Sequence, residues 1–341
     1  MHLAVKKLGK QTVKFDNPPS IISTYSIVGP KEGDGPLKEY FDYILEDDLC
    51  GQKTWEKCES KILEDAIKMA IKNAQLSETQ VEYVLAGDLL NQIISSSYAV
   101  RNLGIPYFGL YGACSTMSES LSLGSMLVDG GYADYLVCAT SSHFCTAERQ
   151  FRFPLELGNQ RPPTSQWTVT GAGAAVLSSS GLGPYVTHVT TGKVVDAGVK
   201  DANNMGAAMA PAAADTIIQH FKDTGYRIED YDLIITGDLA KIGKEIAEEF
   251  IAKAGYDISG IFTDCGIEIF DHERQDTHAG GSGCGCSAVV FCGYIYKLLK
   301  NGDLNRVLLV STGALHSTTS TQQGESIPGI AHAVTISNTR E

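Results

Sequence analysis

Two segments of this chain, about half its length apart, have the same order of features. Residues 125–143 read SMLVDGGYADYLVCATSSH, and residues 296–316 read YKLLKNGDLNRVLLVSTGALH. In each, a helix end meets a glycine (Gly131 or Gly302), and then a polar turn, a short apolar run and a loop rich in small and hydroxyl residues follow. This repetition predicts a chain built from two copies of one α/β unit.

The regions upstream of both segments support the same interpretation. Apolar residues recur every four positions over 62–74, which predicts one face of a helix, and a short apolar run follows at 83–86. In the second half, 246–254 has a helical pattern and 260–263 has a strand pattern. Short continuous apolar strands favour sheets buried on both faces. We therefore expect an α/β fold with halves at 1–180 and 181–341, the alternative being a doubly wound sheet without duplication.

Charge and hydropathy argue against two classes of partner. Lys and Arg number 27 against 40 Asp and Glu, for a formal net charge of −13. An acidic surface repels phosphate backbones, so we expect no nucleic-acid binding. No apolar run reaches the ~18 to 20 residues that cross a bilayer, and the start, MHLAVKKLGK, lacks a signal-peptide core. We expect synthesis in the cytoplasm and no direct membrane span.

The nine cysteines are an odd number and include no CxxC motif. Cys284 and Cys286 have no histidines at zinc-site spacing. Reduced thiols are therefore expected, with no structural metal and no cofactor.

The most informative segment is 111–123, YGACSTMSESLSL. Small residues surround Cys114, apolar residues precede it, and leucines then recur at helical spacing. This predicts a tight turn that places Cys114 at a helix N-terminus, where unpaired N–H groups converge. Such a position suits either a nucleophilic thiol or contact with an anion, whereas a buried inert cysteine is the ordinary alternative.

Three stretches resemble the thiolase superfamily. GACSTMSESLSLGSMLVDGGYADYLVCATSS is similar to its nucleophile turn and following strand, VTGAGAAVLSS to its next glycine-rich strand, and DTHAGGSGCGCSAVV to its C-terminal His or Asn loop. The resemblance runs from roughly residue 20 to 340 and implies a five-layered α-β-α-β-α fold of two duplicated halves. QFRFPLELGNQRPPTSQWTVTGAGAA and STGALHSTTSTQQGESIPGIAHAV are similar to a branch of this superfamily that acts in sporulation of endospore-forming bacteria.

The resemblance carries over only in part at the catalytic positions. Cys114 falls on the thiolase nucleophile, and His278 falls on the histidine of an HxxG motif that ends at Gly281. Near 238, where condensing enzymes have a second histidine, the chain reads IITGDLAKIG. Around Thr312 it reads STGALHSTT, without the second thiolase cysteine. Carbanion chemistry needs a thiolate, an oxyanion hole and a further acid or base, so these changes disfavour condensation while leaving a pocket.

The sporulation resemblance implies binding of dipicolinic acid (pyridine-2,6-dicarboxylate), with or without calcium, for its uptake into the developing spore. Burying a planar dianion in an acidic protein requires local cations, N–H donors and an aromatic surface. The candidate ligand-binding residues are Cys114, His278, Gly281, Thr140, Ser142, Thr312, His316, Arg152, Arg161 and Trp167. His143, in the loop of the first repeat that corresponds to the His316 loop, is a weaker candidate.

Two other functions remain open at this point. One is an acyl-thioester condensing enzyme or acyltransferase with Cys114 as nucleophile and His278 as its partner. The other is a structural subunit of a membrane-associated complex without a ligand. The resemblance further implies a homodimer formed through the strand at 135–139, contacts with other spore membrane-channel proteins, and a peripheral location at the spore inner membrane.

Overall fold

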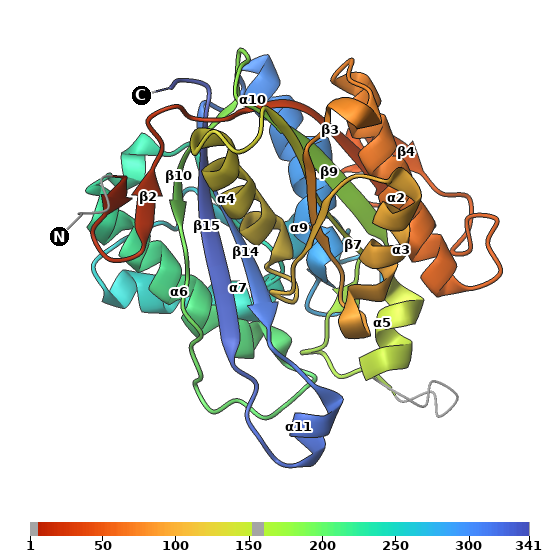
Figure 1. Cartoon of the computed structure of the whole chain (residues 1–341). Helices are drawn as coiled ribbons and strands as arrows, with labels where there is room; N and C mark the ends of the chain where they lie inside the picture. Colours follow the sequence, from red (N-terminus) through yellow and green to blue (C-terminus); the bar gives the residue numbers. More distant parts are fainter. Residues whose placement is uncertain (1–5, 152–159, 341) are drawn as a thin grey trace.

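The computed structural model describes residues 6–151 and 160–340, and its strands fall into two matching sets (Figure 1). The first set is ordered β3 (Ser20–Val28), β9 (Gly171–Ser178), β7 (Tyr135–Ser142), β5 (Tyr83–Gly87) and β6 (Tyr107–Gly109). The second is ordered β10 (Tyr185–Thr190), β15 (Gly329–Ser337), β14 (Arg306–Ala314), β11 (Leu233–Thr236) and β12 (Phe262–Asp264). The sets meet where β10 pairs with β3 through Tyr185 and Ser20.

The pairing within each set shows the duplication. β7 is antiparallel to β9 and parallel to β5, and β14 is likewise antiparallel to β15 and parallel to β11. The two glycines of the sequence repeat lie in matching places, since Gly131 and Gly302 both have a left-handed φ, of 74° and 81°, just after a helix. Expectations of two similar α/β halves are therefore confirmed, and the plain doubly wound alternative is wrong.

Helices form three layers around the two sets of strands. α2 (Trp55–Asn73) and α3 (Ile94–Leu103) cover the outer face of the first set, and α6 (Met205–Thr224) and α7 (Ala240–Lys253) cover that of the second. α4 (Thr116–Asp129) and α9 (Cys284–Val289) contact strands of both sets. α9 continues through a π-helical stretch, Val290–Ile295, into α10 (Tyr296–Asn301). The result is the expected α-β-α-β-α order (Figure 1).

Shorter elements complete the fold. They are β1 (Lys7–Leu8), β2 (Thr12–Lys14), β4 (Tyr43–Ile44), β8 (Trp167–Thr168), β13 (Gly281–Ser282), α1 (Pro30–Gly33), α5 (Phe144–Phe151), α8 (Cys265–Glu268) and α11 (Thr318–Gln322). Single turns lie at Lys38–Tyr40, Glu78–Gln80, Asn91–Ile93 and Ile228–Asp230. The turn at 78–80 has a capping box, in which the Ser77 N–H donates to Gln80 Oε1 at 2.9 Å.

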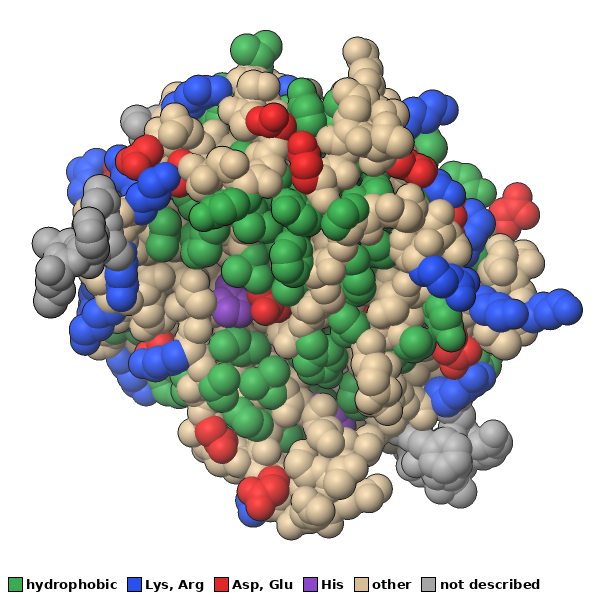
Figure 2. Space-filling view, in the orientation of Figure 1, with side chains coloured by type: hydrophobic (Ala, Val, Ile, Leu, Met, Phe, Trp, Pro, Cys, Tyr) green, Lys and Arg blue, Asp and Glu red, His purple; other side chains and the backbone are tan. Residues whose placement is uncertain are grey.

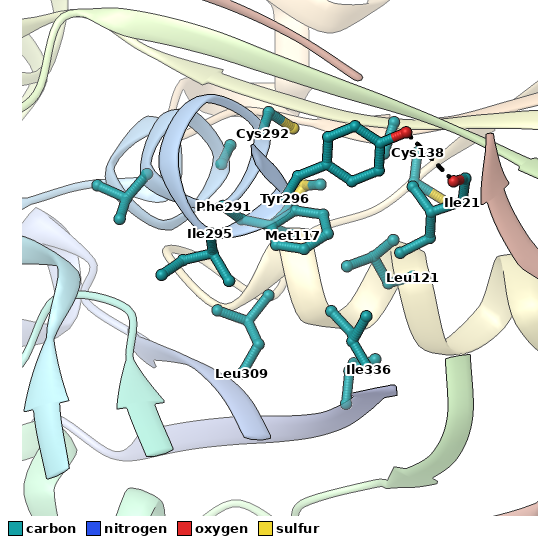
Figure 3. Close-up of a cluster of buried hydrophobic side chains, with 14 of the residues drawn as sticks. Ile21, Met117, Leu121, Cys138, Phe291, Cys292, Ile295, Tyr296, Leu309 and Ile336 are labelled. Carbon is teal, nitrogen blue, oxygen red and sulfur yellow. Dashed lines mark hydrogen bonds between the residues drawn. The ribbon is translucent and has the colours of Figure 1, made fainter. Parts of the chain in front are cut away.

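The central core lies between the two sets of strands. Met117 and Leu121 on α4 face Phe291 and Ile295 of the π-helical stretch, and Leu309 of β14 closes the cluster from the second set (Figure 3). All five side chains are fully buried. Because this layer fills the space between both halves, its packing fixes how the first half sits on the second.

The strand predicted to form the dimer contact, at 135–139, is not at an edge of the sheet, so that predicted location is wrong. β7, which contains 135–139, lies inside the sheet, paired with β9 on one side and β5 on the other. Its backbone hydrogen-bonding groups are already used, so it cannot pair with a second copy. The edge strand of the first set is β6, whose Phe108 is 47% exposed.

A buried acid in α1 gives the first testable prediction. Glu32 is 1% exposed, its Oε1 accepts the Thr170 N–H at 3.0 Å, and burial raises its pKa from 4.5 to about 7. Between these pH values the unfolded chain loses a proton that the folded chain keeps, so this group lowers stability as pH rises. Glu32→Gln should therefore stabilise the protein above pH 7 and lose that advantage near pH 4.5.

Urea unfolding of both proteins at the two pH values measures the difference. The exposed Glu39 provides the control. Glu39→Gln should change the free energy of unfolding little, and by the same amount at the two pH values. A pH-independent effect of Glu32→Gln would contradict the prediction.

Candidate functional site

A cavity of about 460 Å³ lies beyond the carboxyl ends of β7 and β14, where α/β sheets commonly bind ligands. Both halves contribute to its wall. The lining residues are Leu89, Tyr111, Ala113, Cys114, Phe144, Ala147, Glu148, Phe151, Gln160, Arg161, Gln166, Thr168, Ala202, Asn203, Met205, Met209, Ser282, Ala314 and His316.

The expected cysteine turn forms one end of this cavity. Ala113 has a left-handed φ of 50°, and α4 begins at Thr116, two residues after Cys114. The Ser115 and Thr116 hydroxyls donate to the Gly112 and Ala113 carbonyls, each at 2.7 Å, which fixes the turn. Cys114 is 9% exposed and lines the cavity.

Gly313, in the second half, packs its backbone directly against this turn. A Cβ at residue 313 would lie 2.3 Å from the Gly112 carbonyl oxygen and 3.3 Å from the Cys114 nitrogen. The first distance is shorter than real Cβ atoms allow, and the atom met is backbone, so glycine is required for the halves to close around the turn.

A carboxyl group lies next to the Cys114 thiol. The charge of Asp238, which follows β11 and is fully buried, acts on this thiol. Thr312 Oγ1 donates to Asp238 Oδ1 at 2.6 Å, and the Ser282 hydroxyl and the Gly283 N–H each donate to Oδ2 at 3.0 Å. The carboxyl group therefore joins the cysteine turn to the glycine-rich loop at 280–285.

The same environment makes Cys114 a poor nucleophile. Burial, followed by the charge of Asp238, raises the pKa of Cys114 well above its ordinary value. Burial also raises the pKa of Asp238, partly offset by the hydrogen bond from Thr312. Because the thiolate is the reactive form, the neutral thiol suits contact with a ligand better than acyl transfer.

This geometry gives a prediction for thiol reactivity. Asp238→Asn removes the negative charge beside Cys114, so Cys114 should react faster with iodoacetamide than it does in the wild-type protein at the same pH. Peptide mass spectrometry that follows labelling at Cys114 measures the rate. Asp303→Asn, at an exposed position, should leave it unchanged. Equal or slower labelling of a folded Asp238→Asn protein would show that Asp238 does not hold the thiol neutral.

Aromatic and cationic groups form the opposite wall. The Phe144 and Trp167 rings stack with centroids 3.7 Å apart and an interplanar angle of 6°. The Arg161 guanidinium lies 4.8 Å from the Trp167 centroid, and Lys31 Nζ lies 3.6 Å from it. Phe144 and Arg161 line the cavity, so a ligand there meets a stacked ring and a guanidinium together.

Two polar side chains in the wall have a buried atom without a hydrogen-bond partner among the described residues. Gln166 donates through Nε2 to the Asp238 carbonyl at 2.6 Å, which leaves its Oε1 unpaired. His316 packs against the Phe151 ring at 5.3 Å, and its Nδ1 is unpaired. Burial lowers the pKa of His316, so its ring is neutral and can offer an N–H. Such buried unpaired atoms are typical of positions that a ligand or water occupies.

The structure brings some of the predicted site residues to the cavity and places others behind it. Cys114, Arg161 and His316 line it. Trp167 supports Phe144 from behind, and Thr312 holds Asp238. Two hydroxyls tie the glycine-rich loop and its neighbours to β7: Thr140 donates to the Cys284 carbonyl at 2.8 Å, and Ser142 donates to the Val169 carbonyl at 2.7 Å.

Three other predicted residues lie elsewhere. His278, at a left-handed φ of 52°, is not among the lining residues, and its Nδ1 is 3.5 Å from Asp276 Oδ1. Gly281 pairs with Trp167 in the β13–β8 ladder. His143 is buried, with Nε2 2.8 Å from the Asp48 carbonyl oxygen. Arg152 lies outside the described residues.

Sequence reasoning missed Asp238, Ser282, Phe144 and Gln166 as site residues. Asp238 was noticed only as a departure from the histidine of condensing enzymes. The signal for Ser282 was its place in the glycine run, four residues after His278. Phe144 and Gln166 had no distinguishing pattern around them.

Two features are absent from the described ranges, 6–151 and 160–340. These ranges contain no group of three or more His, Cys, Asp or Glu side chains that could hold a metal ion. No helix within them has the length and apolar character needed to cross a bilayer.

Known proteins resemble this chain at two levels. A family described as stage V sporulation protein AD matches residues 9–337. Stage V sporulation protein AD of Bacillus subtilis (strain 168) is 48% identical over 330 residues, which cover 97% of this chain and 97% of that protein. The extent of this match agrees with the resemblance seen in the sequence.

Solved structures of thiolase-fold enzymes share the architecture. The 3-oxoacyl-(acyl-carrier-protein) synthase III of Aquifex aeolicus VF5 has a TM-score of 0.58 at 13% identity and covers 94% of this chain and 99% of its own. Cerulenin-bound OleA of Xanthomonas campestris has a TM-score of 0.58 at 16% identity, covering 94% of this chain and 97% of its own. At such identities the likeness concerns the fold, and it confirms the expected thiolase-like architecture.

Proposed function

Because this chain belongs to the stage V sporulation protein AD family and so has a role in sporulation, we propose that its cavity binds dipicolinic acid for loading into the developing spore. The observation that carries this proposal is the wall in which the Arg161 guanidinium lies beside the stacked Phe144 and Trp167 rings. A planar aromatic dianion needs both a ring surface and a fixed cation.

The rest of the cavity fits the same ligand. A volume of about 460 Å³ lies within the ~300–1,000 Å³ range of small-molecule sites. The neutral Cys114 thiol and the unpaired Nδ1 of His316 add weak polar contacts without another negative charge. Glu148 also lines the cavity, and a cation that accompanies the ligand, such as calcium, would offset the negative charge of its carboxylate.

Calorimetry of the full chain with dipicolinate tests the proposal. Two or three charged contacts, after association costs, predict a Kd on the order of micromolar to millimolar. Benzene-1,3-dicarboxylate is the matched ligand control, because it keeps both carboxylates and lacks the ring nitrogen. Absence of heat at millimolar dipicolinate, with no protection of Cys114 from alkylation, would overturn the proposal.

A second candidate function follows from one observation, the position of Cys114 on a fixed turn inside the cavity. An acyl-thioester condensing enzyme or acyltransferase would carry its acyl group there. Incubation with acetyl- and malonyl-thioesters over a range of pH, followed by intact-mass measurement, distinguishes the two functions. An acyl adduct on Cys114 that turns over would favour the enzyme, and no adduct at any pH would favour the binding protein.

We further propose a homodimer that forms at the β6 edge. Exposed aromatic and aliphatic side chains lie on β6, on α3, which contacts β6, and in the segment just after β6, namely Phe108, Ile94, Tyr98 and Tyr111. Figure 2 displays a band of hydrophobic side chains across the middle of one face of the molecule. A short edge strand beside such side chains favours pairing with a second copy.

Phe108→Lys should therefore shift the protein from dimer to monomer in light scattering, because a charge would be buried in the pair. Phe250→Lys is the control, because Phe250 is 41% exposed on α7, which covers the second set of strands, and the change should leave the mass unchanged. A wild-type monomer at high protein concentration would contradict the prediction.

For its place in the cell, we propose cytoplasmic synthesis and peripheral attachment at the spore inner membrane through other membrane-channel proteins. The supporting observation is membership of a sporulation family. Washing spore membranes with alkaline carbonate tests it, since a peripheral protein is released and an integral one is retained.

A further inference from the structure

A buried carboxyl group that the proposed function does not use lies against α5. Glu59, near the N-terminal end of α2, is fully buried. Its Oε2 is 2.6 Å from the hydroxyl oxygen of Thr146, in the first turn of α5. Its Oε1 is also buried and has no hydrogen-bond partner among the described residues. A carboxylate here would therefore place negative charge on an oxygen that nothing stabilises.

The contacts of Thr146 indicate that Glu59 carries a proton. The Thr146 hydroxyl oxygen is also 3.0 Å from the His143 carbonyl oxygen. A hydroxyl group has one proton, so Thr146 can donate fully to only one of these two oxygens. When Glu59 is protonated, its O–H donates to Thr146 and Thr146 donates to His143, so both contacts are hydrogen bonds. Burial, followed by the charge of Asp88, also raises the pKa of Glu59 well above its ordinary value.

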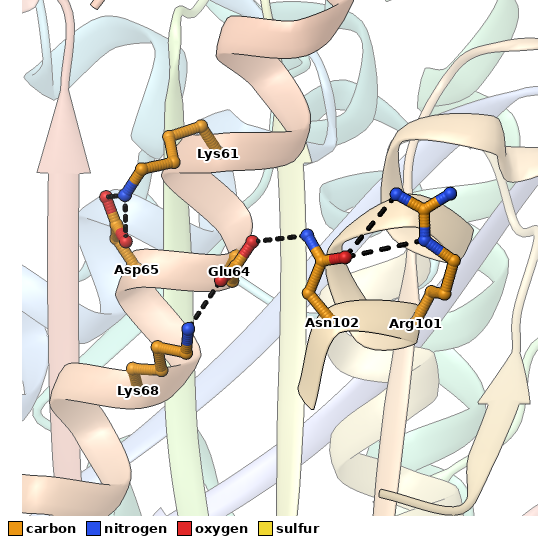
Figure 4. Close-up of polar contacts among 6 residues, drawn as sticks. All are labelled: Lys61, Glu64, Asp65, Lys68, Arg101 and Asn102. Atoms are coloured by element: carbon orange, nitrogen blue, oxygen red, sulfur yellow. Dashed lines mark hydrogen bonds and ion pairs between the residues drawn. The ribbon is translucent and has the colours of Figure 1, made fainter. Parts of the chain in front are cut away.

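α2 provides a fixed frame for this contact. Eight of its 19 residues are buried. Asn102 of α3 donates from Nδ2 to Glu64 Oε2 at 2.8 Å, and Lys68 pairs with the same carboxylate along α2 (Figure 4). α5 has only eight residues. Loss of the contact between Glu59 and Thr146 should therefore displace α5 rather than α2.

α5 connects this contact to the cavity. Phe144, Ala147, Glu148 and Phe151 line the cavity, and at helical spacing these four residues share one face of α5. Thr146 falls on the opposite face and is 2% exposed. The carboxyl group of α2 therefore holds α5 from the side that faces away from the cavity.

We propose that Glu59 is a protonated positioning residue, which holds α5 through Thr146 and so sets the place of the Phe144 ring in the cavity. The effect on dipicolinate binding rests on the proposed function, whereas the effect on α5 does not. Glu59 is not among the residues that line the cavity, so it acts through α5. Loss of one such hydrogen bond should weaken dipicolinate binding about 3- to 10-fold.

Substitutions of Glu59 distinguish its proton from its size. Glu59→Gln replaces the O–H with an N–H that can donate to Thr146, so its affinity for dipicolinate should stay close to that of the wild type. Glu59→Leu has no donor and should show the expected loss by calorimetry, together with faster hydrogen exchange over residues 144–151. Thr146→Val should have the same effects, and combining it with Glu59→Leu should add nothing further. If Glu59→Leu fails to fold, Thr146→Val alone makes this comparison.

Glu64→Leu is the matched control on the same helix. It removes the contact with Asn102 of α3, so it should lower the free energy of unfolding. It should leave hydrogen exchange over residues 144–151 and the affinity for dipicolinate unchanged, because it does not touch α5. The proton is tested separately, since the infrared difference spectrum between the wild-type protein and Glu59→Gln should contain the carbonyl band of a protonated carboxyl group.

The outcomes separate this inference from the proposed function. Unchanged exchange over residues 144–151 in Glu59→Leu, or a loss of affinity in Glu59→Gln as large as that in Glu59→Leu, would overturn the positioning role. Absence of the infrared band would show that Glu59 is not protonated. Faster exchange with unchanged affinity would break the link between α5 and the cavity. The expected exchange and infrared results in a protein that never binds dipicolinate would leave the role of Glu59 in place and defeat the proposed ligand.

Discussion

Arg161→Ala should weaken dipicolinate binding about 10- to 100-fold, with little effect on folding. Arg161 is a guanidinium in the cavity wall, lying 4.8 Å from the Trp167 ring centroid. A hydrogen bond between charged partners contributes about 1.5–3 kcal/mol, which corresponds to this loss of affinity. Calorimetry on the two folded proteins measures it.

Two further variants show whether charge or shape is responsible. Arg161→Lys keeps the positive charge but loses the planar guanidinium group. Its affinity for dipicolinate should therefore lie between those of the wild-type protein and Arg161→Ala. Arg274→Ala removes a guanidinium that is 77% exposed and paired with Asp271, and it should bind normally. If Arg161→Ala bound dipicolinate with wild-type affinity, the wall of Phe144, Trp167 and Arg161 would not be the recognition surface.

The largest effect on stability is expected at the centre of the layered core. Phe291 is fully buried in the π-helical stretch, between α4 and the strands of the second set (Figure 3). Phe291→Ala should lower the free energy of unfolding by about 3–5 kcal/mol, because it removes buried apolar area and leaves a cavity in the layer that both halves share. Denaturant unfolding at constant pH measures this change.

Phe250→Ala is the matched control, because Phe250 is 41% exposed on α7. Removing its ring should lower the free energy of unfolding far less than Phe291→Ala does. If Phe291→Ala fails to fold, Phe291→Leu makes a smaller change. It should still lower the free energy of unfolding more than Phe250→Ala does. Equal stabilities for the Phe291 and Phe250 variants would mean that the central layer does not join the two halves.

The sequence was most informative where local chemistry decides the structure. Gly131 and Gly302 end helices at matching places because glycine readily adopts the left-handed φ that each turn needs. The cysteine turn at 111–116 was also predictable, since small residues, Cys114 and a helical pattern follow one another directly. These features lie within a few residues of one another and do not depend on the other half.

Contacts between the halves could not be predicted in the same way. Asp238 follows a short strand, as many helix-capping acids do, and only the packing of the second half on the first places it against Cys114. His278 fits an HxxG pattern, yet Ser282 is the residue of that loop that lines the cavity. The edge position of β6 was equally hidden, because its three residues are too few to show a pattern.

The close approach at Gly313 limits which substitutions this site can accept during evolution. A Cβ there would lie 2.3 Å from the Gly112 carbonyl oxygen, whereas Cys114 itself is a neutral thiol at the wall of a cavity. Substitution at position 114 can therefore replace the sulfur with another small group, but a side chain at position 313 would force the two halves apart. The geometry of the turn would then be kept even where the residue at 114 changes.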